Sequence, residues 1–299
     1  MRLVITVGGN ALLKRGELLS AANQRANVRT ACAAIARVMA EHEVVLSHGN
    51  GPQVGLLALQ NDAYKAVPAY PFDILGAQSQ AMIGVMMVEE LKNLLPEKDF
   101  VNLVTRTVVS ATDPAFDHPT KFIGPVLTKD EAHVLAKEKG WVIKPDGEHF
   151  RRVIASPEPV EILELPAIKT LLENGFNVIA AGGGGVPVIC ENGVYRGIEA
   201  VIDKDFAASL LAIELKAERL IIATDVDGVY EDWGKPNQKR IDRIGAEELL
   251  KGKWAPGSMG PKVKAACQYV LKTKKTATIG ALHEIEAMVA GQKGTMIVP

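Results

Sequence analysis

The chain has 299 residues, 47% hydrophobic and 23% charged, a composition that is ordinary for a globular protein and argues against disorder. Its 34 basic residues (Lys and Arg) against 35 acidic ones give a formal net charge of −1, so there is no electrostatic case for a nucleic-acid binder. The 3 cysteines form no CxxC pair, which argues against a disulfide framework or a cysteine zinc site and favours a reducing, cytoplasmic setting.

Predicted strands and helices alternate along the first third of the chain. Short apolar runs predict strands over 3–7, 44–47 and 100–109, and apolar residues at helical spacing predict helices over 23–41, 52–60 and 72–95. The last helix is apolar on more than one face, so we expect part of it to lie in a twofold dimer interface. No run reaches the roughly 20 apolar residues of a membrane span, and the apolar start is too short for a signal peptide.

The alternation breaks between about residue 110 and residue 159. This stretch is rich in Pro, Gly, Asp and Lys and contains one predicted helix, over 129–139. We interpret it as an insertion that projects from the main body. Because such a segment packs few apolar side chains, we expect it to be less rigid than the sheet.

Regular alternation resumes and continues to the C-terminus. We expect strands over 177–181, 220–224, 277–279 and 295–298, a hairpin over 186–196, and helices over 167–173, 203–216, 262–271 and 283–290. This pattern is typical of an α/β fold, in which helices cover both faces of a mainly parallel sheet.

Three glycine-rich turns directly follow predicted strands. They are Gly8-Gly9-Asn10, Gly49-Asn50-Gly51 and Gly182-Gly183-Gly184. Ligands of open α/β sheets bind outside the carboxyl ends of the strands, where glycine lets backbone amides come close. A tight turn alone would explain one such loop, but three of them, with Asn beside Gly twice, favour an anion site. No P-loop, nucleophile elbow or HExxH motif occurs.

Lysines occupy the first turns of two predicted helices. Lys204 and Lys262 oppose the helix dipole there, which is tolerable when an anion binds at the same place. On this ground, removing Lys204 should change stability little. Asp203 is a good N-cap residue, and Lys121, taken alone, would be a solvated loop lysine. Glycine loops and such lysines together favour phosphoryl transfer, which needs positioning and charge neutralisation.

The segment 224–230, which also follows a predicted strand, has two possible roles. It either frames a nucleoside or is a plain turn with aspartate caps. Any Mg²⁺ needed for phosphoryl transfer would be held by nucleotide phosphates with few or no protein carboxylates.

Further motifs run in order along essentially the whole chain. They include GGNAL at 8–12, HGNGPQVG at 48–55, DPAF at 113–116, PTK at 119–121, EAVIDKD at 199–205 and GSMGPK at 257–262. Together they resemble the carbamate kinases, members of the amino acid kinase superfamily.

The resemblance implies a fold and an activity. The fold would be a single domain over 1–299, a three-layer αβα sandwich with a mainly parallel central sheet. A lobe of about 1–200, with a projecting subdomain of about 110–159, would hold carbamate or carbamoyl phosphate, and a lobe of about 201–299 would hold ATP or ADP. Such a cytoplasmic homodimer would use Mg²⁺ and interconvert ATP plus carbamate with ADP plus carbamoyl phosphate, usually towards ATP in catabolism, for example in arginine metabolism.

The resemblance also implies roles for single residues. Many amino acid kinases have a lysine where this chain has Thr6, and in carbamate kinases a lysine of the insertion, here Lys121, is thought to replace it. Lys121, Lys204 and Lys262 would neutralise phosphates, Asp203 would orient Lys204, and the three glycine loops would bind carbamate and the transferred phosphoryl group. Nucleotide contacts would come from Thr224, Asp225, Val229, Tyr230, Gly257, Ser258, Met259 and Lys262, and no residue is assigned as a metal ligand.

Two alternatives stay open. The first alternative is another acyl-phosphate or phosphate kinase of the superfamily; Thr6 and Lys121 argue against it. The second is a non-catalytic sensor of nucleotide or carbamoyl phosphate; the presence of all three lysines argues against it.

Overall fold

A central sheet organises the described part of the chain, which in this computed structural model comprises residues 1–13 and 17–299 without the side chains of Asn10, Ala11 and Pro125. Among these residues, eight strands lie in the order β15-β17-β16-β12-β1-β2-β9-β3. All neighbours run parallel except β16 and β17. The strands are β1 (Arg2–Val7), β2 (Glu43–His48), β3 (Phe100–Asn102), β9 (Asn177–Ile179), β12 (Arg219–Thr224), β15 (Arg243–Gly245), β16 (Thr276–Ala281) and β17 (Thr295–Val298).

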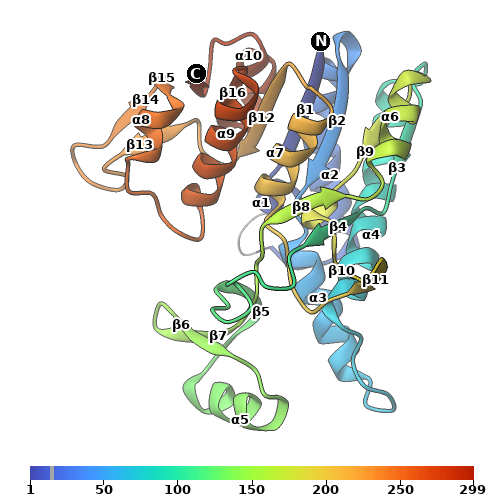
Figure 1. Cartoon of the computed structure of the whole chain (residues 1–299), viewed down its shortest axis with the longest axis vertical. Helices are drawn as coiled ribbons and strands as arrows, with labels where there is room; N and C mark the ends of the chain where they lie inside the picture. Colours follow the sequence, from blue (N-terminus) through green and yellow to red (C-terminus); the bar gives the residue numbers. More distant parts are fainter. Residues whose placement is uncertain (14–16) are drawn as a thin grey trace.

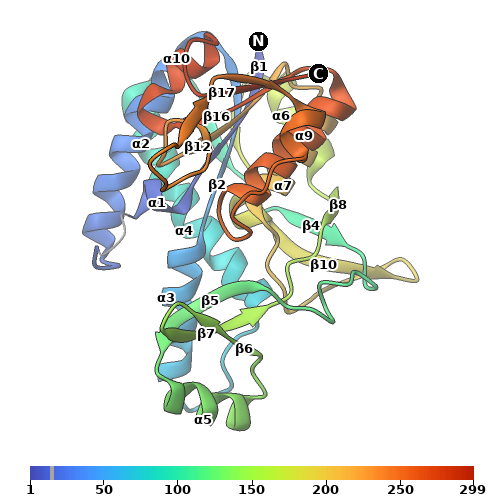
Figure 2. The same cartoon turned by 90° about the vertical axis from the view of Figure 1, so that its left-hand side faces the viewer.

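Helices cover both faces of this sheet, because side chains alternate along each buried strand. In β1, Leu3 and Ile5 face one hydrophobic cluster and Val4 faces the other. The first cluster packs α1 (Gly9–Leu12), α2 (Ala21–Glu41), α4 (Phe72–Leu94) and α10 (Ile285–Val289); the second packs α6 (Leu165–Glu173), α7 (Lys204–Glu214), α8 (Ala246–Leu250) and α9 (Met259–Thr273). Figure 2 shows α2 and α10 on one side and α7 and α9 on the other. The predicted three-layer αβα sandwich is confirmed.

The prediction of one strand over 100–109 is wrong, because this stretch forms two strands in different sheets. β3 lies at an edge of the central sheet, and β4 (Arg106–Val109) belongs to a second sheet, β11-β10-β4-β8, with β8 (Pro159–Ile162), β10 (Val186–Glu191) and β11 (Val194–Gly197). The Gln80 side chain on α4 accepts the N–H of Thr105 at 2.9 Å and donates to its carbonyl at 3.2 Å. This tertiary contact holds the backbone where the chain passes from one sheet to the other.

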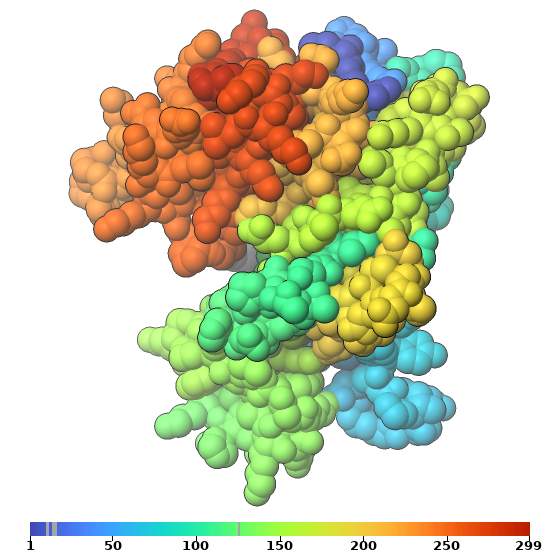
Figure 3. Space-filling model, in the orientation of Figure 1, coloured from blue at the N-terminus to red at the C-terminus, as the bar shows by residue number. Residues whose placement is uncertain are grey.

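Residues 121–154 form a separate subdomain, named here the projecting subdomain. It contains β5 (Lys121–Leu127), α5 (Lys129–Lys139), β6 (Ile143–Asp146) and β7 (His149–Ile154), with the sheet order β5-β7-β6. It lies at the end of the molecule far from both termini (Figure 1) and protrudes there from the body (Figure 3). Ile123 and Ile154 attach it to α3 (Gly51–Ala63) and α4 through a small buried cluster with Val54, Phe72 and Leu75.

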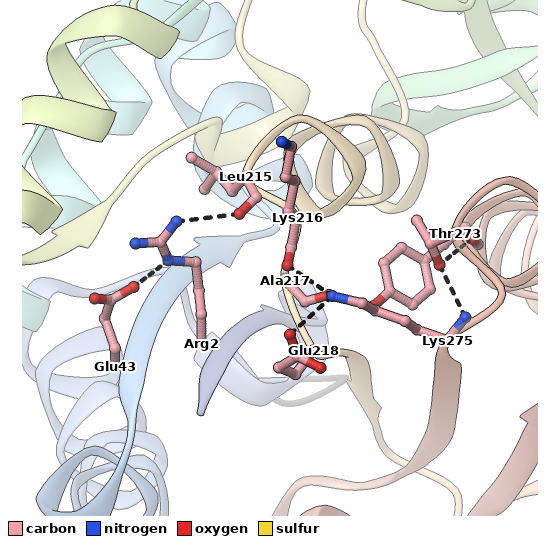
Figure 4. A network of polar contacts seen from close by, with 9 residues as sticks. Arg2, Glu43, Leu215, Lys216, Ala217, Glu218, Thr273 and Lys275 are labelled. Carbon is pink, nitrogen blue, oxygen red and sulfur yellow. Dashed lines mark hydrogen bonds and ion pairs between the residues drawn. The ribbon is translucent and has the colours of Figure 1, made fainter.

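A polar network fixes the amino ends of the central strands, opposite the edge where the glycine turns lie. Arg2 pairs with Glu43 and donates to the carbonyl of Leu215 at 3.1 Å. Lys275 donates to the carbonyl of Lys216 at 2.9 Å and pairs with Glu218 at 2.8 Å. Figure 4 shows the two cations on either side of the turn between α7 and β12.

The remaining elements are η1 (Gly182–Gly184), η2 (Leu282–Glu284) and the hairpin of β13 (Val229–Glu231) and β14 (Lys239–Ile241).

Candidate active site

The carboxyl ends of β1, β2 and β12 meet at one edge of the sheet because these strands are parallel neighbours. A cleft of about 770 Å³ opens there, between the sheet edge and the projecting subdomain. Its walls include all three predicted glycine turns, through Gly8, Gly9, Gly49, Asn50, Gly51 and Gly183. This is the edge of an α/β sheet where ligands bind.

Close packing explains two of the cleft glycines, Gly49 and Gly183. A Cβ on Gly49 would lie 2.7 Å from the Gly9 nitrogen and 3.3 Å from Cδ of Lys204, so a side chain there would push two parts of the cleft apart. Gly183 has φ +63° and faces the Asn50 amide, where a Cβ would clash. That amide donates to Oγ of Ser79 on α4 at 2.7 Å. The second and third glycine loops are therefore held against each other and against α4.

Two lysines share one buried carboxylate. Nζ of Lys204 lies 2.6 Å from Oδ1 of Asp205, and Nζ of Lys262 lies 3.1 Å from Oδ2 of the same residue. The Asp205 side chain is only 2% exposed. Lys204 is the first residue of α7, as the sequence predicts. The helix α9 begins at Met259, before the predicted start at residue 262, so Lys262 is its fourth residue.

Asp203 joins the third lysine to the same place. As the N-cap of α7, its Oδ1 accepts the backbone N–H of Asp205 at 3.0 Å, which confirms its predicted capping role. Its Oδ2 lies 2.8 Å from Nζ of Lys121, 82 positions earlier in the chain and at the start of β5. The lysine of the projecting subdomain is therefore held at the cleft by the residue next to Lys204.

The electrostatics of this cluster favour a bound anion. Burial lowers the pKa of Lys204, and the charge of Lys262 adds to this effect, while Asp205 opposes it. Burial by itself raises the pKa of Asp203, but the charges of Lys121 and Lys204 outweigh it and lower the pKa to about 2. Three ammonium groups face two carboxylates, which leaves one net positive charge in a partly buried cleft.

The predicted nucleotide contacts divide into two groups. Thr224, Asp225, Gly257, Ser258 and Lys262 line the cleft, whereas Val229, Tyr230 and Met259 lie outside its lining. Val229 is fully buried and donates its N–H to Oγ1 of Thr295 at 2.7 Å. The Tyr230 hydroxyl donates to Asp227 at 2.8 Å. These two residues are engaged in packing and in fixing the β13 hairpin.

The predicted substrate-binding residues also fall into two groups, those that line the cleft and those that do not. Gly182 and Gly184 are buried below the cleft, against the His48 ring and the backbone of Ile202 respectively. Asn10 lies in α1, and its side chain is outside the described part of the structure. Thr6 is fully buried in β1 and does not line the cleft.

Sequence reasoning gave too little weight to two residues. Asp205, the last residue of the EAVIDKD motif, holds two of the lysines. Arg151 lines the cleft from β7, where it donates to the carbonyl of Gly124 at 3.2 Å. The Arg151-Arg152 pair, next to the apolar Val153 and Ile154, was the signal that could have identified this strand as functional.

The cleft offers little for a metal ion. Among the described residues, no three His, Cys, Asp or Glu side chains are grouped so that they could hold one. Asp203 and Asp205, the carboxylates deepest in the cleft, already contact lysines.

Within the described part of the chain, no helix has the length and apolar character needed to cross a membrane.

This fold, with lysines and glycine loops at the carboxyl edge of its sheet, has counterparts among known proteins. The sequence model described as "Amino acid kinase family" matches residues 1–280, and the chain belongs to this family.

More similar relatives narrow this assignment. The carbamate kinase of Haemophilus influenzae is 53% identical, over 99% of this chain and 96% of that protein, and the carbamate kinase of Escherichia coli K12 is 50% identical, over 99% and 98%. The structure of the carbamate kinase from Giardia lamblia bound to AMP-PNP is 40% identical, with a TM-score of 0.92 over 99% of this chain and 98% of that one. Within the family, these relatives place the chain among the carbamate kinases.

Proposed function

We propose that the chain transfers a phosphoryl group reversibly between ATP and carbamate, giving ADP and carbamoyl phosphate, and works mainly towards ATP. One observation carries the proposal: Lys121, Lys204 and Lys262, from three separate segments, converge on two aspartates beside three glycine loops. The similarity to carbamate kinases of about 50% identity over the full chain supports the choice of substrate.

The chemistry fits what this cleft can supply. In the direction of ATP synthesis, a terminal phosphate oxygen of ADP attacks phosphorus, the bond from phosphorus to the carbamate oxygen breaks, and carbamate leaves as an anion. No proton has to move, so no general base is required. The protein must align the two substrates and neutralise the spreading negative charge, which preorganised ammonium groups do well in a water-poor site.

Each part of the cluster has its own role in this proposal. Lys204 and Lys262, fixed by Asp205, neutralise the phosphates from the protein body. Lys121 has a side chain that is 39% exposed, so it is free to exchange its contact with Asp203 for the transferred phosphoryl group. Asp203 orients Lys204 by starting its helix.

We assign the two substrates to different parts of the cleft lining. The loops around Gly9, Gly49 and Gly51 would bind carbamate or carbamoyl phosphate. Thr224, Asp225, Gly257 and Ser258 would contact ATP or ADP. Because the deep carboxylates already contact lysines, we assign Mg²⁺ to the phosphates of the bound nucleotide, where it adds positive charge.

A coupled assay of ATP formation from ADP and carbamoyl phosphate tests the proposal, with acetyl phosphate as a matched acyl phosphate. We expect turnover with carbamoyl phosphate and at least about a hundredfold lower kcat/KM with acetyl phosphate, because a site built to hydrogen-bond an N–H group strongly rejects analogues that lack it. Equal use of both would favour another acyl-phosphate kinase. Binding of ADP and carbamoyl phosphate without turnover would favour a sensor.

A further inference from the structure

An ion pair at the base of the projecting subdomain lies outside the cleft lining. Nη2 of Arg152, on β7, lies 2.8 Å from Oε1 of Glu199. The guanidinium carbon is 4.6 Å from the centre of the Trp141 ring and 5.1 Å from that of the Phe72 ring. Arg152 and Trp141 belong to the subdomain, whereas Phe72 and Glu199 belong to the body. The arginine therefore links the two through a charge contact and ring contacts.

This pair lies on the same face of the subdomain sheet as Lys121. In the register of β5 and β7, Lys121 faces Ile154 and Ile123 faces Arg152. Residues two apart on a strand, and residues opposite each other on neighbouring strands, share a face. Ile123 and Ile154 are buried against α3 and α4, so this face is the one that docks on the body.

Besides α3 and α4, the docking face meets a short segment of the body, residues 199–203. Arg152 contacts Glu199 at the beginning of this segment, and Lys121 contacts Asp203 at its end. Between them, the N–H of Val201 donates to the carbonyl of Ala155, directly after β7, at 3.0 Å. Three contacts thus set the position of the subdomain along the segment that carries Asp203 and leads into Lys204.

Glu199 also connects this segment to α4. Its Oε2 accepts the N–H of Phe72, the first residue of α4, at 3.1 Å. Ser79, two turns later in α4, receives the Asn50 amide of the second glycine loop. One carboxylate therefore contacts the subdomain through Arg152 and, through its backbone contact, the helix that supports a glycine loop.

We propose that Arg152 is a positioning residue: by pairing with Glu199 between two aromatic rings, it fixes the subdomain on residues 199–203 and so holds Lys121 over the cleft. The inference rests on the function proposed above, in which Lys121 contacts the transferred phosphoryl group. The Lys121 ammonium group contacts Asp203, and a misplacement of about 1 Å can cost a reaction about a hundredfold in rate.

The test is a double-mutant cycle in the ATP-forming assay with Arg152→Ala, Lys121→Ala and the double variant. We expect Arg152→Ala to lower kcat by about 10- to 100-fold and to change the KM for ADP by less than about twofold, because Arg152 does not line the cleft that holds the proposed nucleotide contacts. In the Lys121→Ala background, the same substitution should lower kcat by less than about twofold. Equal losses in both backgrounds would mean that Arg152 does not act through Lys121.

Further variants separate positioning from folding. Arg152→Lys keeps the charge but loses the planar fork, so its kcat should lie between those of the wild type and Arg152→Ala, with an unchanged circular dichroism spectrum. Glu199→Gln keeps an acceptor for the N–H of Phe72 and should lower kcat in the same direction. The control Arg196→Ala removes an exposed ion pair with Glu191 in the β10–β11 hairpin and should leave kcat unchanged.

Failure of this proposal is distinct from failure of the proposed function. A folded wild-type protein that makes no ATP from carbamoyl phosphate counts against the function. An active wild type whose Arg152→Ala and Arg152→Lys variants keep full kcat counts against the positioning role alone.

Discussion

Lys204 and Lys262 contact opposite oxygens of the Asp205 carboxylate, at 2.6 and 3.1 Å. The two ammonium groups come from the first turns of α7 and α9, so one buried carboxylate joins the cleft-facing ends of two helices. Burial lowers the pKa of Lys204, and the charge of Lys262 acts in the same direction because the two cations repel each other. A bound phosphate would relieve this repulsion.

Lys204→Ala should separate activity from stability. We expect kcat to fall by at least about a hundredfold, as for the loss of one preorganised charge at a transition state. The free energy of unfolding should fall by less than the ~3 kcal/mol typical of a broken buried ion pair, because Lys262 still neutralises Asp205. Steady-state kinetics and urea unfolding measure both. The control is Lys169→Ala, on the exposed side of α6. An unfolded variant, or one with an intact rate, would show that Lys204 is structural.

Lys121→Ala should lower kcat more than it raises the KM for carbamoyl phosphate. The reason is that its contact with the phosphoryl group would form mainly in the transition state. The matched control is Lys137→Ala, an exposed lysine of the same subdomain. Equal kinetics for the two variants would make Lys121 an ordinary solvated lysine.

The projecting subdomain should become less mobile when the cleft is filled. Hydrogen exchange over 121–154 should slow with ADP and an unreactive analogue of carbamoyl phosphate, because the bound phosphate would take over the Lys121 ammonium group from Asp203 and close the subdomain over the ligand. The control region is the buried strand β1, whose exchange should not change. Unchanged exchange in the subdomain would argue against closure.

Acid sensitivity should depend on Asp203. The pKa of this residue is about 2 in the folded protein, against an ordinary value of 3.8, because Lys121 and Lys204 outweigh the effect of burial. A carboxylate with a lowered folded pKa contributes stability above pH 4 that is lost as the pH falls towards 2. Urea unfolding of Asp203→Asn should show about 2 kcal/mol less stability than the wild type at pH 6 and a shrinking difference between pH 4 and pH 2. A constant difference over that range would contradict this.

Two exposed apolar residues on one side of α4 should lie in a homodimer interface. Ile74 and Val85, about three turns apart, are 42% and 51% exposed, although other residues of this helix are fully buried in the core. Light scattering at micromolar concentration should therefore give about twice the chain mass of 32.1 kDa, and Val85→Glu should shift it towards the monomer. The control is Val134→Glu on α5, an equally exposed position. A monomeric wild type would refute the prediction.

Local pattern was enough wherever a residue's role depends on its neighbours in the chain. The helix over 129–139 matches α5 in both bounds, and the strand over 295–298 matches β17. Asp203 was predicted to cap the helix that begins at Lys204, and it does. In each case the deciding interactions, namely hydrophobic periodicity and capping, act over a few residues.

Long-range contacts were beyond such reasoning. The sequence near residues 100–109 does not indicate two strands, because the break between them is held by Gln80 of the distant helix α4, which bonds the backbone of Thr105. The same holds for Val229 and Tyr230, which come after a strand that ends at the cleft. A hydrogen bond from the N–H of Val229 to Thr295 and one from the Tyr230 hydroxyl to Asp227 hold them in the β13 hairpin instead.

The sequence by itself therefore determined the α/β class, the edge of the sheet where a ligand binds and the types of residue that face it. Only the tertiary structure decided which charges meet: Lys121 with Asp203, 82 positions apart, and Lys262 with Asp205, 57 positions apart. Helix and strand formation follows from local propensity and periodicity. Ion pairs between distant segments depend on the packing of the whole sheet, since only that packing brings their side chains within a few ångströms and removes them from water.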